Sequence, residues 1–386
     1  MLSFGNYLVK IFKLSVKIKR LFLGSFLRFF LSPFYLLFLF RKRREIVNVR
    51  TIVVVKLERI GDLVLSIPAI HSIKKKFPES KLTIIVNSYT QEVIKNDPNI
   101  DSVIVYNRNI SVRDKIKFIK ALRNERFDLA IDLTTRDFFF LPALIIYLTN
   151  AKIKIGLDNL GRGFLFDVRV NPPPNPMHLS QEVLNIVSSL GIEAEEIRPK
   201  LFVSNNDREY IKRFLKELDV REDRLLVVIH PGGHFKTQRW KEDGYAGVSD
   251  YLIKRYGACV FFIGDERDKE VMRRILSLTE EKPFDLVGKL SLGKVMALIS
   301  VSHLFIGNNS GPLHIATALS IPTISFLGPT PEERWHPLGD RNIVFKKDLP
   351  CIPCELGYCL RNDFGCMQEI GVQEVIEAID SIFSKE

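Results

Sequence analysis

The feature that most constrains the fold of this chain is an alternation of short apolar runs with longer amphipathic stretches. In the first half, amphipathic stretches at 62–76, 90–96 and 112–124 are expected to be helices. They separate four runs rich in β-branched residues that read as buried parallel strands: 51–55, 82–86, 102–106 and 128–133. Strands and helices in alternation predict a doubly wound α/β domain.

The same alternation starts again near Leu225 and predicts a second α/β domain. The run N-P-P-P-N-P at 171–176 cannot continue a helix or a central strand, so it begins a linker region. Val372–Phe383 reads as a terminal amphipathic helix. A chain of 386 residues, 46% of them hydrophobic, can bury two ordinary cores. The strands expected in the second domain are 225–229, 259–263, 304–307 and 322–327.

Most of the positive charge lies in residues 1–50. This segment holds eleven Lys and Arg against one acid, Glu45, a net charge of +10. The other 336 residues then carry 45 basic against 44 acidic side chains, a net charge of +1. A nearly neutral body argues against a broad nucleic-acid footprint.

The basic segment favours attachment to a membrane surface. Its cations recur at steps of three or four from Lys10 to Arg28, along one stripe of a helix that would lie in the interface of an anionic membrane. A transmembrane helix over 21–40 has the required length, but it must carry Arg28 and Pro33. A signal peptide does not fit, because the apolar run ends in R-K-R-R. A further alternative is an extra helix packed on the body.

Two loops at expected strand ends have the composition of ligand-binding turns. In open α/β sheets, ligands bind beyond the carboxyl ends of the strands. Arg59-Ile60-Gly61-Asp62 joins a strand to a helix, although from spacing alone an N-cap is the simpler account of Asp62. His230-Pro231-Gly232-Gly233-His234 allows a backbone to approach a ligand, although such a turn is common without one.

Two further loops carry polar residues at helix starts. Gly307–His314 reads G-N-N-S-G-P-L-H, in which Pro312 suits the first helical position and Ser310 or Asn309 can cap. Capping leaves the two glycines and His314 unexplained, and a phosphate at the helix N-terminus would account for them. Asp265 and Glu266 offer carboxylates for ribose hydroxyls, with an N-cap as the simpler account.

Four of the five cysteines fall within sixteen residues: Cys351, Cys354, Cys359 and Cys366. This spacing is compatible with a structural zinc or iron–sulfur centre. A cytoplasmic chain would keep these thiols reduced, which disfavours two disulfides.

Four motifs together resemble glycosyltransferase family 9, which includes the heptosyltransferases of lipopolysaccharide core assembly. They are V-V-K-L-E-R-I-G-D-L-V-L-S-I-P-A-I, H-P-G-G-H-F-K-T-Q-R-W, G-N-N-S-G-P-L-H-I-A-T-A and F-L-G-P-T-P-E-E-R-W-H-P. The resemblance runs from about Thr51 to the C-terminus. It implies a GT-B fold in which two Rossmann-like domains face a cleft: an acceptor domain over 51–200, a nucleotide-sugar domain over 201–370, and a final helix over 371–386 that returns to the first domain.

The resemblance also implies inverting sugar transfer that requires no cofactor. Asp62 matches the family's proposed general base, and we place Arg59, Gly61, Thr134 and Arg136 on the acceptor side. The leaving diphosphate would meet the amides of Ser310 and Gly311 and the side chain of His314. The donor site as a whole is expected to comprise Gly232, Gly233, Lys236, Gln238, Arg239, Asp265, Glu266, Asn309, Ser310, Gly311, Pro312 and His314.

This chain departs from the family's pattern at two positions. Gln238 stands where relatives often have the lysine of Lys-Arg-Trp, so Lys236 or Arg239 would supply the cation instead. Asn309 stands where core heptosyltransferases commonly have an aspartate before Ser/Thr-Gly-Pro.

The function expected from the sequence is transfer of a sugar, most simply heptose from ADP-heptose, to a lipid-linked saccharide. The enzyme would act at the cytoplasmic face of the inner membrane, attached as a peripheral or monotopic protein. Two alternatives stay open: a sugar-nucleotide epimerase of the same fold, and a non-catalytic nucleotide-sugar-binding scaffold.

Overall fold

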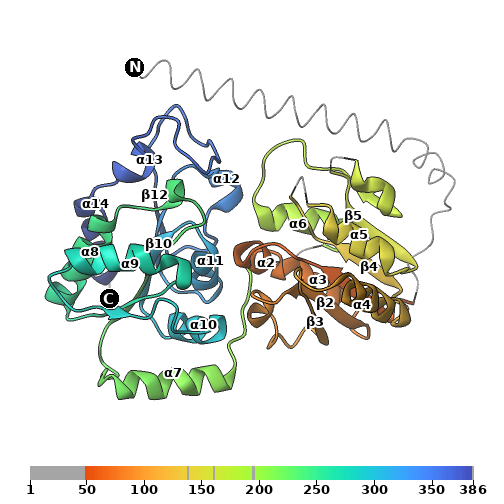
Figure 1. Cartoon of the computed structure of the whole chain (residues 1–386), viewed down its shortest axis with the longest axis horizontal. Coiled ribbons are helices and arrows are strands. Elements are labelled where there is room, and N and C mark those ends of the chain that lie inside the picture. Colours follow the sequence, from red (N-terminus) through yellow and green to blue (C-terminus); the bar gives the residue numbers. More distant parts are fainter. Residues whose placement is uncertain (1–47, 137–138, 160, 194–195, 385–386) are drawn as a thin grey trace. The chain divides into compact units, whose positions relative to one another are not determined.

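The structure, a computed structural model, describes residues 48–136, 139–159, 161–193 and 196–384. The described residues up to Lys200 form one compact unit and those from Leu201 onward form a second (Figure 1). Nearly all of the basic segment 1–50, with its expected membrane helix, lies outside the described residues. Within the described ranges, no helix has the length and apolar character needed to cross a bilayer.

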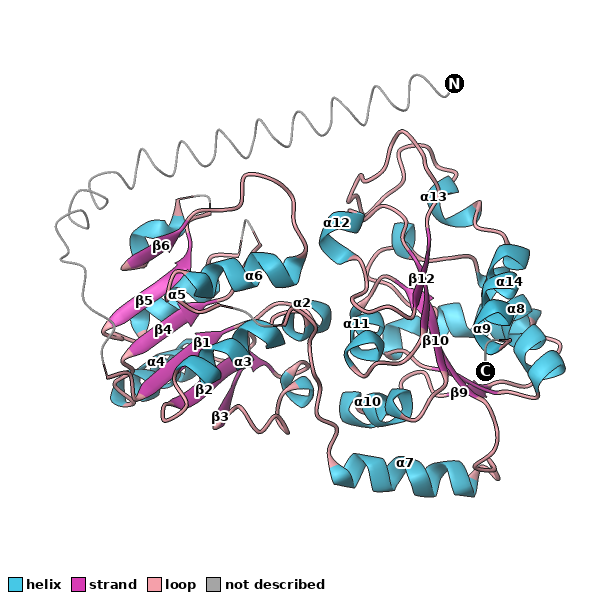
Figure 2. Ribbon diagram, turned by 180° about the vertical axis from the view of Figure 1, so that it is seen from behind, coloured by secondary structure: helices cyan, strands magenta, loops and turns pink. Residues whose placement is uncertain are grey.

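The N-terminal unit is a doubly wound sheet of six parallel strands in the order β3-β2-β1-β4-β5-β6 (Figure 2). Its strands are β1 (Thr51–Val55), β2 (Lys81–Asn87), β3 (Ser102–Tyr106), β4 (Leu129–Asp132), β5 (Ile153–Leu157) and β6 (Val168–Val170). Its helices are α2 (Ile60–Val64), α3 (Ile67–Lys76), α4 (Val112–Asn124), α5 (Leu141–Leu148) and α6 (Leu179–Ser188), with short 3₁₀ turns at Gln91–Val93 and Arg162–Leu165.

The C-terminal unit repeats this topology. Its six parallel strands lie in the order β12-β11-β10-β7-β8-β9. The strands are β7 (Leu226–His230), β8 (Cys259–Phe262), β9 (Phe284–Asp285), β10 (Leu304–Asn308), β11 (Thr323–Phe326) and β12 (Asn342–Phe345). The helices are α7 (Asn205–Glu217), α8 (Glu242–Tyr256), α9 (Lys269–Leu278), α10 (Leu292–Ser300), α11 (Gly311–Ala318), α12 (Glu332–Trp335), α13 (Gly365–Gln368) and α14 (Val372–Phe383), with 3₁₀ turns at Lys236–Gln238 and Glu266–Asp268.

The two sheets confirm the expected α/β class and show where ligands should bind. In each sheet the first three strands run outward in one direction and the next three in the other. The order therefore reverses between β1 and β4 in the first unit and between β7 and β10 in the second. Ligands of such sheets bind beyond the carboxyl ends of the strands at this reversal.

Two helix predictions in the N-terminal unit are wrong in detail. The stretch 62–76 is not one helix but two, α2 and α3, because Pro68 enters at the start of α3 and supplies no N–H to a preceding turn. The stretch 90–96 forms only the 3₁₀ turn Gln91–Val93.

The terminal helix α14 packs within the C-terminal unit. Val375, Ala378 and Ile379 are buried in its core. The hydroxyls of Tyr251 and Tyr256 on α8 both donate to Asp380 Oδ1, each at 2.7 Å. The apolar face of the helix is thus buried in its own unit, and the return of residues 371–386 to the N-terminal domain stays a prediction.

We predict that Ile379→Ala lowers the free energy of unfolding of the C-terminal unit by about 2–5 kcal/mol, since it leaves a cavity where a fully buried side chain stood. Tryptophan fluorescence during urea unfolding measures this, because Trp240 and Trp335, the two tryptophans of the chain, both lie in this unit. The exposed Glu377→Ala on the same helix is the control. An unchanged midpoint for Ile379→Ala would show that α14 does not stabilise this unit.

Candidate active site

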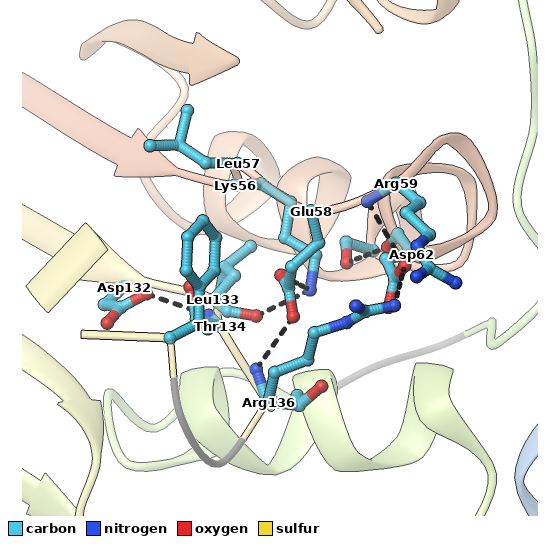
Figure 3. Close-up of polar contacts among 12 residues, drawn as sticks. Lys56, Leu57, Glu58, Arg59, Asp62, Asp132, Leu133, Thr134 and Arg136 are labelled. Carbon is cyan, nitrogen blue, oxygen red and sulfur yellow. Dashed lines mark hydrogen bonds and ion pairs between the residues drawn. The ribbon is translucent and has the colours of Figure 1, made fainter. Parts of the chain in front are cut away.

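Asp62 is a buried carboxylate at the reversal point of the first sheet. Strand β1 ends at Val55, and α2 begins four residues after Lys56, so that Asp62 lies in the first turn of the helix. Its Oδ2 accepts a hydrogen bond from the Arg59 backbone N–H at 3.2 Å and lies 3.3 Å from an Nη of Arg136 (Figure 3). Asp62 is 3% exposed, whereas the Arg136 side chain is 38% exposed. One charged group is therefore fixed and its partner can reach solvent.

A second charged pair lies in the loop between β1 and α2, close to Asp62 in the sequence. Lys56 and Glu58 have fully buried side chains, and Lys56 Nζ lies 2.7 Å from Glu58 Oε2. Lys56 Nζ also donates to the Leu133 carbonyl at 2.8 Å, and Glu58 Oε1 accepts from the Thr135 backbone N–H at 3.4 Å (Figure 3). Burial raises the pKa of Glu58, and the adjacent Lys56 ammonium opposes that rise. The pair joins the end of β1 to the segment that follows β4.

Arg162 fixes the same segment from the other side. It is 1% exposed, and its guanidinium donates to the carbonyls of Thr134 at 2.6 Å, Arg136 at 3.1 Å and Phe139 at 3.2 Å. A buried cation that donates to several carbonyls has its hydrogen-bonding capacity met without an acid. Lys56, Glu58 and Arg162 thus set the backbone from which Arg136 reaches Asp62.

Thr134 is fully buried in this segment. The Asp132 Oδ1 accepts from the Thr134 backbone N–H at 2.9 Å. Within the described residues, Asp132 Oδ2 and Thr134 Oγ1 have no hydrogen-bond partner. Burial raises the pKa of Asp132, against the opposing charges of Arg162 and Lys56. Thr134 is therefore buried, and its place on the acceptor side stays a prediction.

In the C-terminal unit, Asn308 holds the Pro-Gly-Gly turn in place. It is the last residue of β10 and is fully buried. Its Nδ2 donates to the carbonyls of Pro231 and Gly232, each at 2.9 Å, and its Oδ1 accepts from the Trp240 backbone N–H at 2.9 Å. A Cβ at Gly232 would come within 2.6 Å of the Asp268 carboxyl, so only glycine fits beside this acid.

His230 connects the end of β7 with the start of α11. Its Nδ1 lies 3.1 Å from Ser310 Oγ, and its Nε2 lies 3.8 Å from Asp268 Oδ2. Burial lowers the pKa of His230, while the charge of Asp268 opposes the shift. A neutral imidazole at this place orients the Ser310 hydroxyl at the mouth of the helix.

Ser310 and His314 occupy different depths at the start of α11. Ser310 is the N-cap residue, but its side chain makes no capping hydrogen bond. Gly311 and Pro312 are half-buried and follow directly, whereas His314 is 1% exposed, with its ring centroid 6.1 Å from that of Trp335. His314 is thus buried in the first turn of α11, and its contact with a phosphate stays a prediction.

The remaining donor-site candidates lie around the Pro-Gly-Gly turn. Arg239 donates to the Gly233 carbonyl through Nε at 3.1 Å and Nη2 at 2.8 Å. Lys236 is exposed and Gln238 is half-buried in the adjoining 3₁₀ turn. Asn309 Nδ2 donates to the Trp335 carbonyl at 3.2 Å. The structure thus brings Gly232, Gly233 and Arg239 together at the sheet's carboxyl edge.

Asp265 and Glu266 are engaged on the surface. Asp265 accepts from the Arg267 backbone N–H at 2.8 Å, and its ion pair with the Arg267 side chain lowers its pKa. Glu266 Oε2 lies 2.7 Å from Lys269 Nζ. The simpler account of Asp265 as an N-cap is confirmed.

The four clustered cysteines line one small apolar cavity. None of the four forms a disulfide, and the cavity, of about 30 Å³, is also lined by Leu349, Leu356 and Phe364. Burial and the neighbouring thiols raise the pKa of Cys366 to about 12. A metal ligand must be a thiolate, and within the described ranges no three His, Cys, Asp or Glu side chains are placed to hold one metal ion. The structure gives the expected zinc or iron–sulfur centre no ligand set.

Several residues of these sites were not predicted from the sequence. Lys56 and Glu58 stand inside the V-V-K-L-E-R-I-G-D motif, and charged residues directly after a wholly apolar strand are the signal that would have found them. Arg162 and Asp268 have no comparable signal, because only the folded chain brings them to the strand ends.

The comparison with known families gives one match over most of the chain. The profile of glycosyltransferase family 9 (heptosyltransferase) matches residues 115–362, which is more than half of the sequence. A lipopolysaccharide heptosyltransferase 3 from Escherichia coli is 28% identical over 300 residues, which cover 74% of this chain and 85% of that protein.

Solved structures with the same fold belong to similar proteins. A glycosyl transferase family 9 from Veillonella parvula DSM 2008 has a TM-score of 0.78 at 21% identity, covering 89% of this chain and 100% of that one. An E. coli ADP-heptose lps heptosyltransferase II has a TM-score of 0.71 at 18% identity, covering 87% of this chain and 99% of that one. At this identity the likeness shows the fold: both units have the architecture of these glycosyltransferase structures.

We predict that Asp132→Asn raises stability at pH 8 and changes it less at pH 5. A carboxyl group whose pKa is raised by folding stabilises the protein below its unfolded pKa, and this contribution is lost as pH rises through the folded pKa. Asparagine keeps the acceptor for the Thr134 N–H without the buried charge. Calorimetric melting of both proteins at the two pH values measures the difference. A variant that melts below the parent at pH 8 would show that Lys56 and Arg162 require an ionised Asp132.

Proposed function

Because the chain belongs to glycosyltransferase family 9, we propose that it transfers a heptose from ADP-heptose to a lipid-linked saccharide, with inversion and without a metal. That the chain is a glycosyltransferase follows from its family and from its heptosyltransferase relatives. The donor is inferred from the name of the E. coli ADP-heptose heptosyltransferase, and the acceptor from the lipopolysaccharide heptosyltransferase.

The observation that carries the proposal is the Asp62 carboxylate, buried and oriented by the Arg59 N–H and by Arg136. In the proposed reaction, Asp62 removes the proton of the acceptor hydroxyl as its oxygen attacks the anomeric carbon of the donor sugar. The new glycosidic C–O bond forms while the bond from that carbon to the diphosphate oxygen breaks. The proton stays on Asp62, and the nucleoside diphosphate leaves with the electron pair. Attack from the face opposite the leaving group inverts the anomeric centre.

Arg136 and Arg59 have a further role on the acceptor side. The half-exposed Arg136 guanidinium beside Asp62, and Arg59 before it, would bind polar or anionic groups of the acceptor. Gly61 is buried at the start of α2, and this lets the helix begin close to the strand end. Thr134 supports the segment from beneath.

The C-terminal unit is proposed to hold the donor. Negative charge develops on the leaving diphosphate in the transition state, and the amides of Ser310 and Gly311 at the mouth of α11 suit that charge. The side chain of Arg239 is anchored on the Gly233 carbonyl, and Lys236 is exposed beside it, so these two residues would supply the cations. His230 would act through Ser310 by orienting its hydroxyl. His314, which is buried, would act through the packing of the first helical turn.

A lipid-linked acceptor places the reaction at a membrane. We infer that the enzyme works at the cytoplasmic face of the inner membrane as a peripheral or monotopic protein. The basic segment 1–50 would contribute to this attachment through its net charge of +10.

We predict that Asp62→Asn lowers the rate of transfer by about 10²–10⁴-fold, the usual contribution of a general base, and leaves nucleotide binding unchanged. The amide keeps the size of the side chain but cannot take a proton. Single-turnover transfer with a purified lipid-linked core acceptor measures the rate, and Glu79→Gln, an exposed acid of the same unit, is the control. Turnover at the parent rate would remove Asp62 from the mechanism.

We predict that the full chain binds ADP in preference to UDP, GDP and CDP in calorimetric titrations, and that Arg239→Ala weakens ADP binding at least tenfold. A charge-assisted hydrogen bond to phosphate is worth roughly 1.5–3 kcal/mol. Arg273→Ala, an exposed arginine on α9 of the same unit that pairs with Glu270, should bind ADP normally. Selection of another diphosphate would change the sugar. Binding of none would favour the scaffold, and ADP-sugar turnover without an acceptor would favour an epimerase.

A further inference from the structure

We propose that the outer face of α4 and α5 in the N-terminal unit docks on an anionic lipid surface. The proposal adds to the proposed function a membrane contact on the folded N-terminal unit. It rests on that function for the reason to visit a membrane, but not for the residues that make the contact.

Exposed apolar side chains gather on these two helices. Eleven large apolar side chains are exposed among the described residues. Two of them lie on α4, and three lie on α5 or directly before it. Val112 is 73% exposed and Ile116 is 52% exposed, one turn apart on α4. On α5 the exposed positions are three or four residues apart and form one stripe: Phe140, Leu144 and Tyr147.

Helices α4 and α5 lie side by side (Figures 1 and 2) and contact each other near both ends. Just before α4 begins, the guanidinium of Arg108 lies 5.7 Å from the ring centroid of Phe139, which comes just before α5. Where the helices end, Arg123 Nε of α4 donates to the Leu148 carbonyl of α5 at 2.9 Å. Contacts at both ends keep the helices aligned.

The core does not require these exposed residues. Leu122 of α4 and Ala143, Ile145 and Ile146 of α5 are buried against the sheet in the unit's core. The side chains of Ile116, Leu144 and Tyr147 extend away from that core. A solvent-exposed apolar stripe next to a satisfied core indicates a surface for a partner.

Charge decides which partner fits. Helix α4 carries five cations and one acid, Asp114, a net charge of +4, and the cations are Arg113, Lys115, Lys117, Lys120 and Arg123. Apolar side chains among Lys and Arg are typical of helices that lie in the interface of an anionic membrane. Each cation near such a surface contributes about 1 kcal/mol of attraction, equal to roughly fivefold in affinity.

The same charge disfavours the two other candidate occupants. The chain's own residues 1–50 carry a net charge of +10, and a second copy would present another face with the same +4 helix. Both would place cations against cations, whereas anionic headgroups complement the face and acyl chains accept the apolar residues.

The test uses a tryptophan placed on this face of the full chain. Leu144→Trp puts the reporter on α5, and Leu276→Trp on α9 of the C-terminal unit is the matched control, because both leucines are 37% exposed. Each variant is mixed with phosphatidylglycerol–phosphatidylethanolamine vesicles whose acyl chains are brominated, which quench tryptophan only at bilayer depth. We expect the emission added by Leu144→Trp to be quenched and that added by Leu276→Trp to persist.

A charge-reversed protein tests the electrostatic part. Lys117→Glu together with Lys120→Glu should weaken partitioning of the full chain onto the same vesicles by roughly tenfold or more at low salt, in proportion to the charge removed. Lys269→Glu with Arg273→Glu on α9 is the matched control and should have little effect.

Four results would overturn the proposal. Three are the absence of quenching for Leu144→Trp, equal quenching of both introduced tryptophans, and equal binding to phosphatidylcholine vesicles. The fourth is a Leu144→Trp emission that is already shifted to the blue without vesicles, because this would show that protein covers the face. Calorimetric ADP binding on the same samples separates this outcome from failure of the proposed function, because nucleotide binding does not involve α4 or α5.

Discussion

The ion pair between Lys56 and Glu58 is the interaction on which the N-terminal site depends. Both side chains are fully buried, and they connect the end of β1 to the backbone after β4, across the point where the strand order reverses. Buried ion pairs rarely add net stability, because desolvation offsets their attraction. Here the pair has a positional role: together with Arg162 it fixes the segment that brings Arg136 to Asp62.

The C-terminal unit solves the same problem with neutral groups. Asn308 at the end of β10 hydrogen-bonds the turn after β7, and His230 at the end of β7 reaches Ser310 after β10. The side chains therefore cross between the two strands that flank the reversal, as Lys56 and Glu58 do in the first unit. The difference in chemistry matches the proposed roles. A diphosphate site needs hydrogen-bond donors and accessible backbone N–H groups, whereas a general base needs a carboxylate held in one position.

The sequence predicts the class of fold and the loops of the site, but not how far each side chain is exposed. Alternating apolar runs place β1, β4, β7 and β10 correctly, because strands buried on both faces are nearly all apolar. Short strands such as β9, with only two residues, leave no such pattern. His314 shows the limit for the site: its place in the first turn of α11 follows from the sequence, but its burial depends on the folded chain, in which Trp335 of α12 lies near its ring. Arg162 and Asp268 are beyond prediction for the same reason.

In the proposed reaction, the Asp62 carboxylate activates the acceptor for one direct displacement at the anomeric carbon. The most direct test is the anomeric configuration of the first-formed product, determined by proton NMR after transfer from ADP-heptose of known configuration to a lipid-linked core saccharide. We expect a product whose anomeric configuration is opposite to that of the donor. A product that retains the donor's configuration would contradict it, because retention requires a covalent intermediate or a front-face route in which Asp62 is not the base of a single displacement.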